Sequence, residues 1–175
     1  MKRLEGPSQL FRAWLIHDVE EALAFPSTCD DLAVLTGIAP LRITAAQSWL
    51  AVTLAGLGVR YACQRGAASK GHSRLYRGTV AGLELHVLTH VLASVARRGY
   101  TAGLVTAPLV MLPGARRARQ ELAELGRPLT FPDGLRGIGF LLSLALLSHG
   151  LARLALPRAT WLGARRHEPE LEMTR

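Results

Sequence analysis

The stretch Leu15–Pro26, LIHDVEEALAFP, places one histidine and three acidic residues in an otherwise apolar segment. Successive residues of a helix are rotated by about 100°, so His17 and Glu21 lie one turn apart on the same stripe. Glu20 lies about 60° to the other side of His17, whereas Asp18 points about 100° away and is peripheral. One imidazole and two carboxylates on one face suit acid–base chemistry or a metal ion, and the alternative is a solvated face near a terminus.

The composition of the whole chain favours a membrane protein. Of its 175 residues 49% are hydrophobic and only 19% are charged, and the charges gather between apolar runs. The formal net charge of +8 is not interleaved with aromatic residues, which make up 6%, so we expect no nucleic-acid partner. The basic residues instead fit the positive-inside bias of a multi-pass protein of the cell inner (cytoplasmic) membrane, in contact with the lipid bilayer.

The apolar runs predict an all-α fold, a polytopic membrane helix bundle of about five helices in one domain, 1–175. The first helix is expected at 8–25 and to end there, because proline disfavours helix in the residue before it. A loop is expected at 27–42. Further helices are expected at 43–63, 78–97, 100–122 and 135–156, followed by a polar tail at 157–175. If the first helix only lies at the interface, four helices span the bilayer.

A second polar set lies in the predicted helix 78–97. His86 and His90 are spaced i, i+4 and share one face, as paired metal-binding histidines on a helix usually do. Glu84 is about 160° from His86, so it is a reserve ligand at most. His149, in the last helix, is a further candidate ligand. Each of these histidines has an alternative interpretation as a hydrogen bond between helices.

Several of these residues resemble those of a known family. His17-Asp18-Val19-Glu20-Glu21 with Phe25-Pro26, and later the run GYTAGLVTA at 99–107 leading to Leu112-Pro113, are similar to the HXXEE-motif family of small bacterial membrane proteins. The resemblance covers roughly residues 10–120. It implies a membrane location but no activity, because the family has no general assigned one. The motif positions carried over are His17, Glu20 and Glu21, with His86 or His90 as the downstream histidine.

The first functional hypothesis is a metal-dependent membrane oxidoreductase or hydrolase that acts on a hydrophobic small-molecule substrate. Nitrogen and oxygen donors in a bundle interior suit iron, zinc or manganese as the divalent metal. Iron would serve oxygen activation and zinc water activation. One glutamate can instead remain a general base. The candidate metal ligands are His17, Glu20, Glu21, His86, His90 and His149.

Two other hypotheses use the same residues without a metal. In the first, Glu20 or Glu21 donates a proton and His86 is the complementary base, which is isomerase or cyclase chemistry. In the second, the polar cluster belongs to a small proton, ion or ligand transporter. The chain has no GxSxG, GxGxxG or P-loop motif to decide between them.

Overall fold

The structure, a computed structural model, describes residues 4–157, and all regular elements in that range are helices. The long helices are α1 (Gly6–Thr36), α2 (Ala45–Ala68), α3 (Arg74–Arg97), α4 (Leu112–Glu124) and α5 (Phe131–Ala155). A 3-10 helix, η1 (Ala39–Leu41), precedes α2, and a π-helical segment, η2 (Ala107–Met111), leads into α4. The predicted all-α bundle is confirmed. Of the predicted polar tail, 157–175, only Pro157 lies within the described residues.

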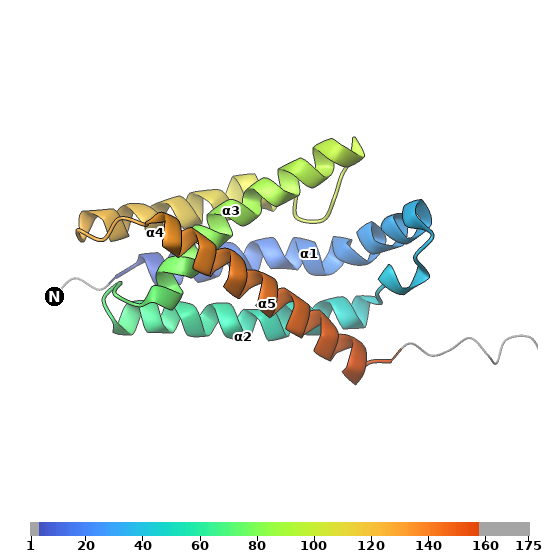
Figure 1. Ribbon diagram of the computed structural model, residues 1–175, viewed down its shortest axis with the longest axis horizontal. Coiled ribbons are helices and arrows are strands. Elements are labelled where there is room, and N and C mark those ends of the chain that lie inside the picture. The colour runs from blue at the N-terminus through green and yellow to red at the C-terminus, as the bar shows by residue number, and fades with distance from the viewer. Residues whose placement is uncertain (1–3, 158–175) are drawn as a thin grey trace, which may run out of the picture.

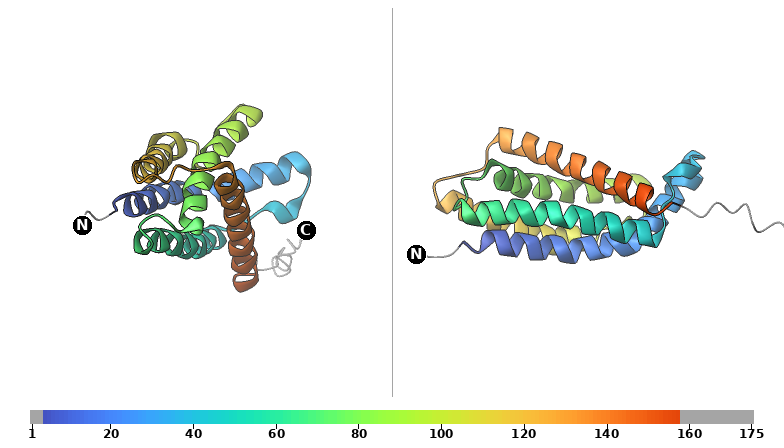
Figure 2. Two further views of the ribbon diagram at one scale, coloured as in Figure 1. Left: turned by 60° about the vertical axis from the view of Figure 1, so that its left-hand side comes forward. Right: turned by 90° about the horizontal axis from the view of Figure 1, so that it is seen from below.

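The helices pack side by side along the long axis of the molecule (Figures 1 and 2). α1 packs against α2 and α4, and α5 covers α2 and α3 on the other side. Leu10 and Trp14 of α1 meet Tyr76 and Leu83 of α3 in the buried core, where Leu122 of α4 joins them. Side chains of α1 and α3 thus meet across the bundle, and both predicted polar sets lie on these two helices.

The first helix is longer than predicted, because it continues through Pro26 to Thr36. Proline lacks the N–H that would bond the carbonyl four residues earlier, which normally ends or kinks a helix. Here the segment beyond the proline is held by tertiary contacts: Cys29 and Ala33 are buried, and the Ala102 N–H donates to the Thr28 hydroxyl at 3.2 Å. The prediction of a loop at 27–42 was therefore wrong, since only the part after Thr36 leaves the helix.

The segment between the predicted helices 43–63 and 78–97, residues 64–77, is mostly helical in the structure. α2 runs on to Ala68, and α3 already begins at Arg74. Ser73 caps α3 by accepting the Tyr76 N–H at 3.3 Å. Arginine has a good intrinsic helix propensity, so basic residues that end an apolar run need not end a helix.

α3 and α5 cross close to their N-terminal ends and diverge beyond that point (Figure 1). The backbones touch at the crossing, since a Cβ on Gly137 would collide with the backbone of Gly78 and Gly82. Arg77 fastens the same end, donating to the Asp133 carboxylate at 2.7 Å in a largely buried ion pair. α3 and α5 therefore diverge from the point where Gly137 meets Gly78 and Gly82.

Two helices, α3 and α5, are long and apolar enough to cross a membrane by length and composition. In the described part of the chain, α1, α2 and α4 do not have this combination of length and apolar composition. The finding is a weak indication of membrane association, because the core helix of a soluble protein can have the same length and composition. It does not support the five or four spans that the apolar runs predict.

Candidate metal centre

Four potential metal ligands converge between α1 and α3. His17 and Glu21 of α1 meet His86 and His90 of α3, and one ligand atom from each lies within 4.8 Å of all the others. His17 and His90 are buried, and Glu21 and His86 are partly buried. Each helix supplies two residues spaced i, i+4, so the two stripes that the helical period predicts face each other.

The backbone determines which nitrogen of His90 carries its hydrogen. His90 Nδ1 lies 2.8 Å from the carbonyl oxygen of Ala102, and because a carbonyl can only accept, Nδ1 is the donor. In neutral His90 the lone pair is then on Nε2. That atom lies 3.0 Å from His86 Nε2 and 3.5 Å from Glu21 Oε1, so it points into the centre of the group.

A chain of two hydrogen bonds does the same for His17. The Thr106 hydroxyl donates to Glu20 Oε2 at 2.5 Å, so its oxygen is left to accept from His17 Nδ1 at 3.0 Å. The lone pair of His17 is therefore on Nε2. This nitrogen is buried and has no hydrogen-bond partner among the described residues, as expected for an atom directed at a ligand that is not a protein group.

His86 has a corresponding partner in its own helix. The Thr89 hydroxyl donates to the His86 carbonyl at 2.7 Å and faces His86 Nδ1 at 3.2 Å, where it accepts. With this assignment both Nε2 atoms of the α3 pair carry lone pairs. Two lone pairs 3.0 Å apart repel each other unless a cation lies between them. Imidazoles whose second nitrogen donates to an oxygen are the usual arrangement around a protein-bound metal.

The distances fit a metal of the zinc or iron type. Nitrogens that bind one ion at about 2.0–2.1 Å lie about 3.0–3.4 Å apart at the angles of common geometries, and the α3 pair is at 3.0 Å. The widest separation in the group is at most 4.8 Å, so it would have to close by at most about 1.4 Å to reach the upper end of this range. Three neutral imidazoles and one carboxylate are a donor set for zinc, iron or manganese.

Gly103 lies against the two buried imidazoles. It has a φ of +84°, and a Cβ there would come within 2.6 Å of His90 Nδ1 and 2.7 Å of His17 Cε1. Only glycine leaves both rings in place while adopting this backbone conformation. The loop between α3 and η2 therefore forms one wall of the centre.

Glu20 does not lie in the converging group but binds the start of η2. Its carboxylate accepts the backbone N–H groups of Val105 at 3.3 Å and Thr106 at 2.8 Å, as anions at helix N-termini do. The Tyr100 hydroxyl donates to it at 2.6 Å. Partial burial and this bond raise the pKa of Tyr100 to about 12, so the phenol remains a donor at neutral pH. The structure thus places Glu20 behind His17, through Thr106.

The remaining candidates lie apart from the converging atoms. Glu84 accepts from Arg119 at 2.6 Å in an ion pair, away from the histidines. His149 of α5 packs its ring 5.1 Å from that of Phe25 and lines a cavity next to the centre. Asp18, interpreted as peripheral from the sequence, is buried and lines the same cavity.

Several supporting residues were not predicted, because their partners are far away in sequence. Thr106, Tyr100 and Gly103 all belong to the run GYTAGLVTA, which the sequence comparison with the motif family already singled out without assigning it a role. A glycine between short polar residues before a proline-containing helix is a signal for a turn. It does not show which side chain the turn contacts.

Comparisons with known proteins agree with the motif. No curated protein and no solved structure matches the chain. A family model described as "Protein of unknown function with HXXEE motif" matches residues 9–117, which include all four converging ligands. Since this match covers more than half of the 175 residues, the chain belongs to the HXXEE motif family.

Proposed function

We propose that this protein is a membrane-embedded, metal-dependent enzyme that acts on a lipid-soluble small molecule. The observation that carries the proposal is the orientation of the three imidazoles. His17 and His90 have their Nδ1 hydrogens committed to oxygen acceptors, so their Nε2 lone pairs point toward Glu21 and His86. Without a cation, this arrangement of imidazoles leaves buried nitrogens without a hydrogen-bond partner, which costs free energy.

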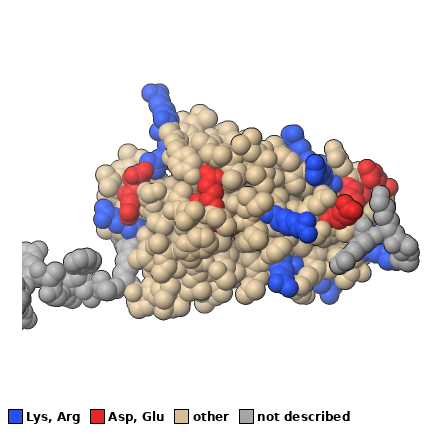
Figure 3. All heavy atoms as spheres, turned by 180° about the vertical axis from the view of Figure 1, so that it is seen from behind, with Lys and Arg blue, Asp and Glu red and all other residues tan. Residues whose placement is uncertain are grey.

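The membrane part of the proposal is supported by the surface of α5. Only 11% of the most apolar 18-residue segment of α5 is buried, although α5 is the more apolar of the two candidate spans. Leu142, Leu146 and Leu154 are 58%, 66% and 81% exposed. Figure 3 shows the face opposite to α5, where much of the surface is also uncharged, although one acidic patch and some basic side chains lie near its middle. Soluble monomers rarely expose continuous apolar surface of this kind, whereas lipid would cover it.

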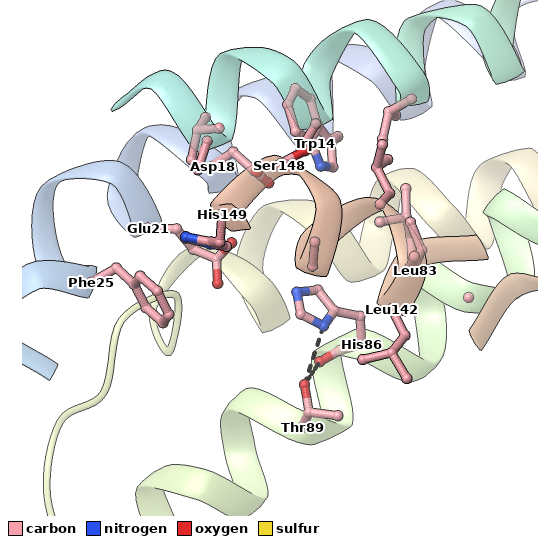
Figure 4. A pocket seen from close by; sticks show the side chains of 18 of the residues that line it. Trp14, Asp18, Glu21, Phe25, Leu83, His86, Thr89, Leu142, Ser148 and His149 are labelled. Carbon is pink, nitrogen blue, oxygen red and sulfur yellow. Dashed lines mark hydrogen bonds between the residues drawn. The ribbon is translucent and has the colours of Figure 1, made fainter. Parts of the chain in front are cut away.

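Access to the centre indicates which residues take part in the reaction. Glu21 and His86 project into the cavity from α1 and α3 (Figure 4), while His17 and His90 are not among its lining residues. A divalent ion held by the group would polarise a substrate oxygen or activate water. Glu21 is then either the fourth ligand or the base that takes a proton on the cavity side. His17 and His90, which do not line the cavity, would act only as ligands of that ion.

A metal-free alternative is supported by one specific observation. If Thr89 turns its hydrogen toward His86 Nδ1, then His86 Nε2 can donate to His90 Nε2, since the two atoms are 3.0 Å apart. His86 and His90 would then hold a proton between their Nε2 atoms, at the position where a metal ion is proposed. In that case Glu21 and His86 would perform acid–base chemistry of the isomerase or cyclase type.

Metal content separates these two functions. Protein expressed in medium supplemented with zinc, iron and manganese is purified in detergent without chelator and analysed by elemental mass spectrometry. We expect close to one ion per chain in the wild type and at least a tenfold loss in the His17→Ala/Glu21→Gln double variant. His72→Ala is the matched control, because His72 is exposed and outside the group. Metal-free wild-type protein would refute the proposal and favour the acid–base alternative.

A further inference from the structure

The cavity beside the centre is large enough for a small-molecule ligand. Its volume is about 590 Å³, within the range of about 300–1,000 Å³ common for ligand pockets. Residues of α1, α2, α3 and α5 line it, and Figure 4 shows Glu21 and His86 on its wall together with apolar side chains such as Leu83 and Leu142. The cavity is therefore a mainly apolar chamber with the candidate metal centre on one wall.

The opening of the cavity follows from the divergence of α3 and α5. Gly82, at the crossing of these helices, and Leu88 and Leu142, beyond it, all line the cavity. Leu88 and Leu142 are also 53% and 58% exposed, so the same side chains belong to the chamber and to the outer surface. The rim is thus apolar, and it lies between the two helices that are able to span a membrane. An entrance of this kind faces the side of the bundle.

Two buried polar groups in the chamber lack a partner. Asp18 is 5% exposed and Ser48 is 1% exposed, and both line the cavity. Asp18 Oδ1 and Ser48 Oγ make no hydrogen bond to any described residue. Buried polar atoms in proteins nearly always have a partner, so these two are suited to bind a polar group of a ligand. Glu21 lies on the same helix, three residues after Asp18, at the metal centre.

The charge of the chamber limits what that polar group can be. Two carboxylate side chains, Asp18 and Glu21, line it, and the lining residues in the described part of the chain include no lysine or arginine. Phosphate headgroups are recognised by arginine, lysine or helix N-termini, and the chamber lining offers a phosphate neither arginine nor lysine. A neutral hydroxyl can both donate to and accept from a carboxyl or a serine.

We propose that the chamber binds a long-chain lipid with an uncharged hydroxyl head, which enters sideways from the bilayer between the diverging halves of α3 and α5. The head binds Asp18 and Ser48, next to Glu21 and His86, and the chain extends toward the rim leucines. The inference rests on the proposed function, since it names the substrate class of that site. It disfavours phospholipids, because the chamber lining offers an anionic head no lysine or arginine, and only the proposed metal ion would attract a phosphate there.

Photolabelling tests this proposal with a defined probe, an alkyne-tagged octadecanol that carries a diazirine in its chain. Purified protein in lipid nanodiscs is irradiated with the probe, and labelled residues are mapped by mass spectrometry. We expect labels on the cavity-lining parts of α3 and α5. Unlabelled octadecanol is expected to compete at least tenfold better than octadecyl phosphate. Equal competition by the phosphate, or labels confined to outer surfaces, would overturn the proposal.

Variants at the entrance provide the matched comparison. Ala145→Trp places a large ring in the cavity lining and is expected to reduce labelling at least fivefold. Leu146→Trp is the control, because Leu146 is the next residue of α5, is exposed and does not line the cavity. Leu142→Trp is a second blocking variant at an exposed rim position, so the test does not depend on one variant folding. Wild-type labelling in both blocking variants would refute the entrance.

Metal content measured on the same samples separates the two proposals. Labelling as expected in protein that holds no metal would support the lipid chamber and refute the metal-dependent function alone. Stoichiometric metal with labels outside the chamber would refute the lipid inference and leave the metal-dependent function standing.

Discussion

Thr106→Val tests whether the hydrogen-bond chain behind His17 supports metal binding. Valine has nearly the shape of threonine but removes both the acceptor for His17 Nδ1, at 3.0 Å, and the donor to Glu20, at 2.5 Å. The His17 ring then loses the contact that directs its Nε2 into the centre. Loss of such an outer partner typically weakens metal affinity by about 10- to 100-fold, which corresponds to about 1.4–2.8 kcal/mol.

The assay is a competition titration with a chromophoric zinc chelator on detergent-purified protein, combined with thermal unfolding of the same samples. Thr79→Val is the control, since Thr79 is also buried and its hydroxyl bonds the Leu75 carbonyl of its own helix at 2.9 Å. We expect the control to lose some thermal stability and to keep wild-type zinc affinity. A zinc affinity of Thr106→Val within twofold of wild type would show that the chain does not orient His17.

Two further predictions concern the framework of the centre. Gly103→Ala should lower metal content at least tenfold by crowding the two imidazoles, whereas Gly126→Ala, at a glycine with φ +72° and open space, should only cost about 1–2 kcal/mol of backbone strain. Equal metal content in both variants would contradict this. Asp133→Asn breaks the buried pair with Arg77, at a cost of about 3–5 kcal/mol, and should lower the melting temperature by about 6–20 °C. Asp30→Asn, in an exposed pair, should change it little, and equal shifts in these two variants would refute the role of burial.

The part of the site that the sequence predicts is the part that depends on helical periodicity alone. His17 with Glu21, and His86 with His90, are i, i+4 pairs whose relative directions hold in any regular helix. The structure brings both pairs together in one group. Their meeting depends on how the bundle brings the side chains of α1 and α3 together, which the sequence does not determine.

The errors come from features whose local signal is outweighed by distant contacts. Pro26 is a valid local stop signal, yet α1 continues because residues far along the chain, such as Ala102, contact the segment beyond it. The number of spans, in contrast, stays a prediction, because it was inferred from apolar runs, which do not distinguish core from lipid-facing surface. Of the described helices, only α3 and α5 have the length and composition of a span.

The two adjacent glutamates of the motif, Glu20 and Glu21, point in different directions because successive residues of a helix are rotated by about 100°. Glu21, four residues after His17, stays on the same stripe and reaches the centre. Glu20, three residues after His17, turns to the other side and binds the first N–H groups of η2, where Thr106 connects it back to His17. The motif thus supplies two of the four candidate ligands and a third residue that contacts one of them through Thr106. The two glutamates can have these different roles because one follows the histidine by three residues and the other by four.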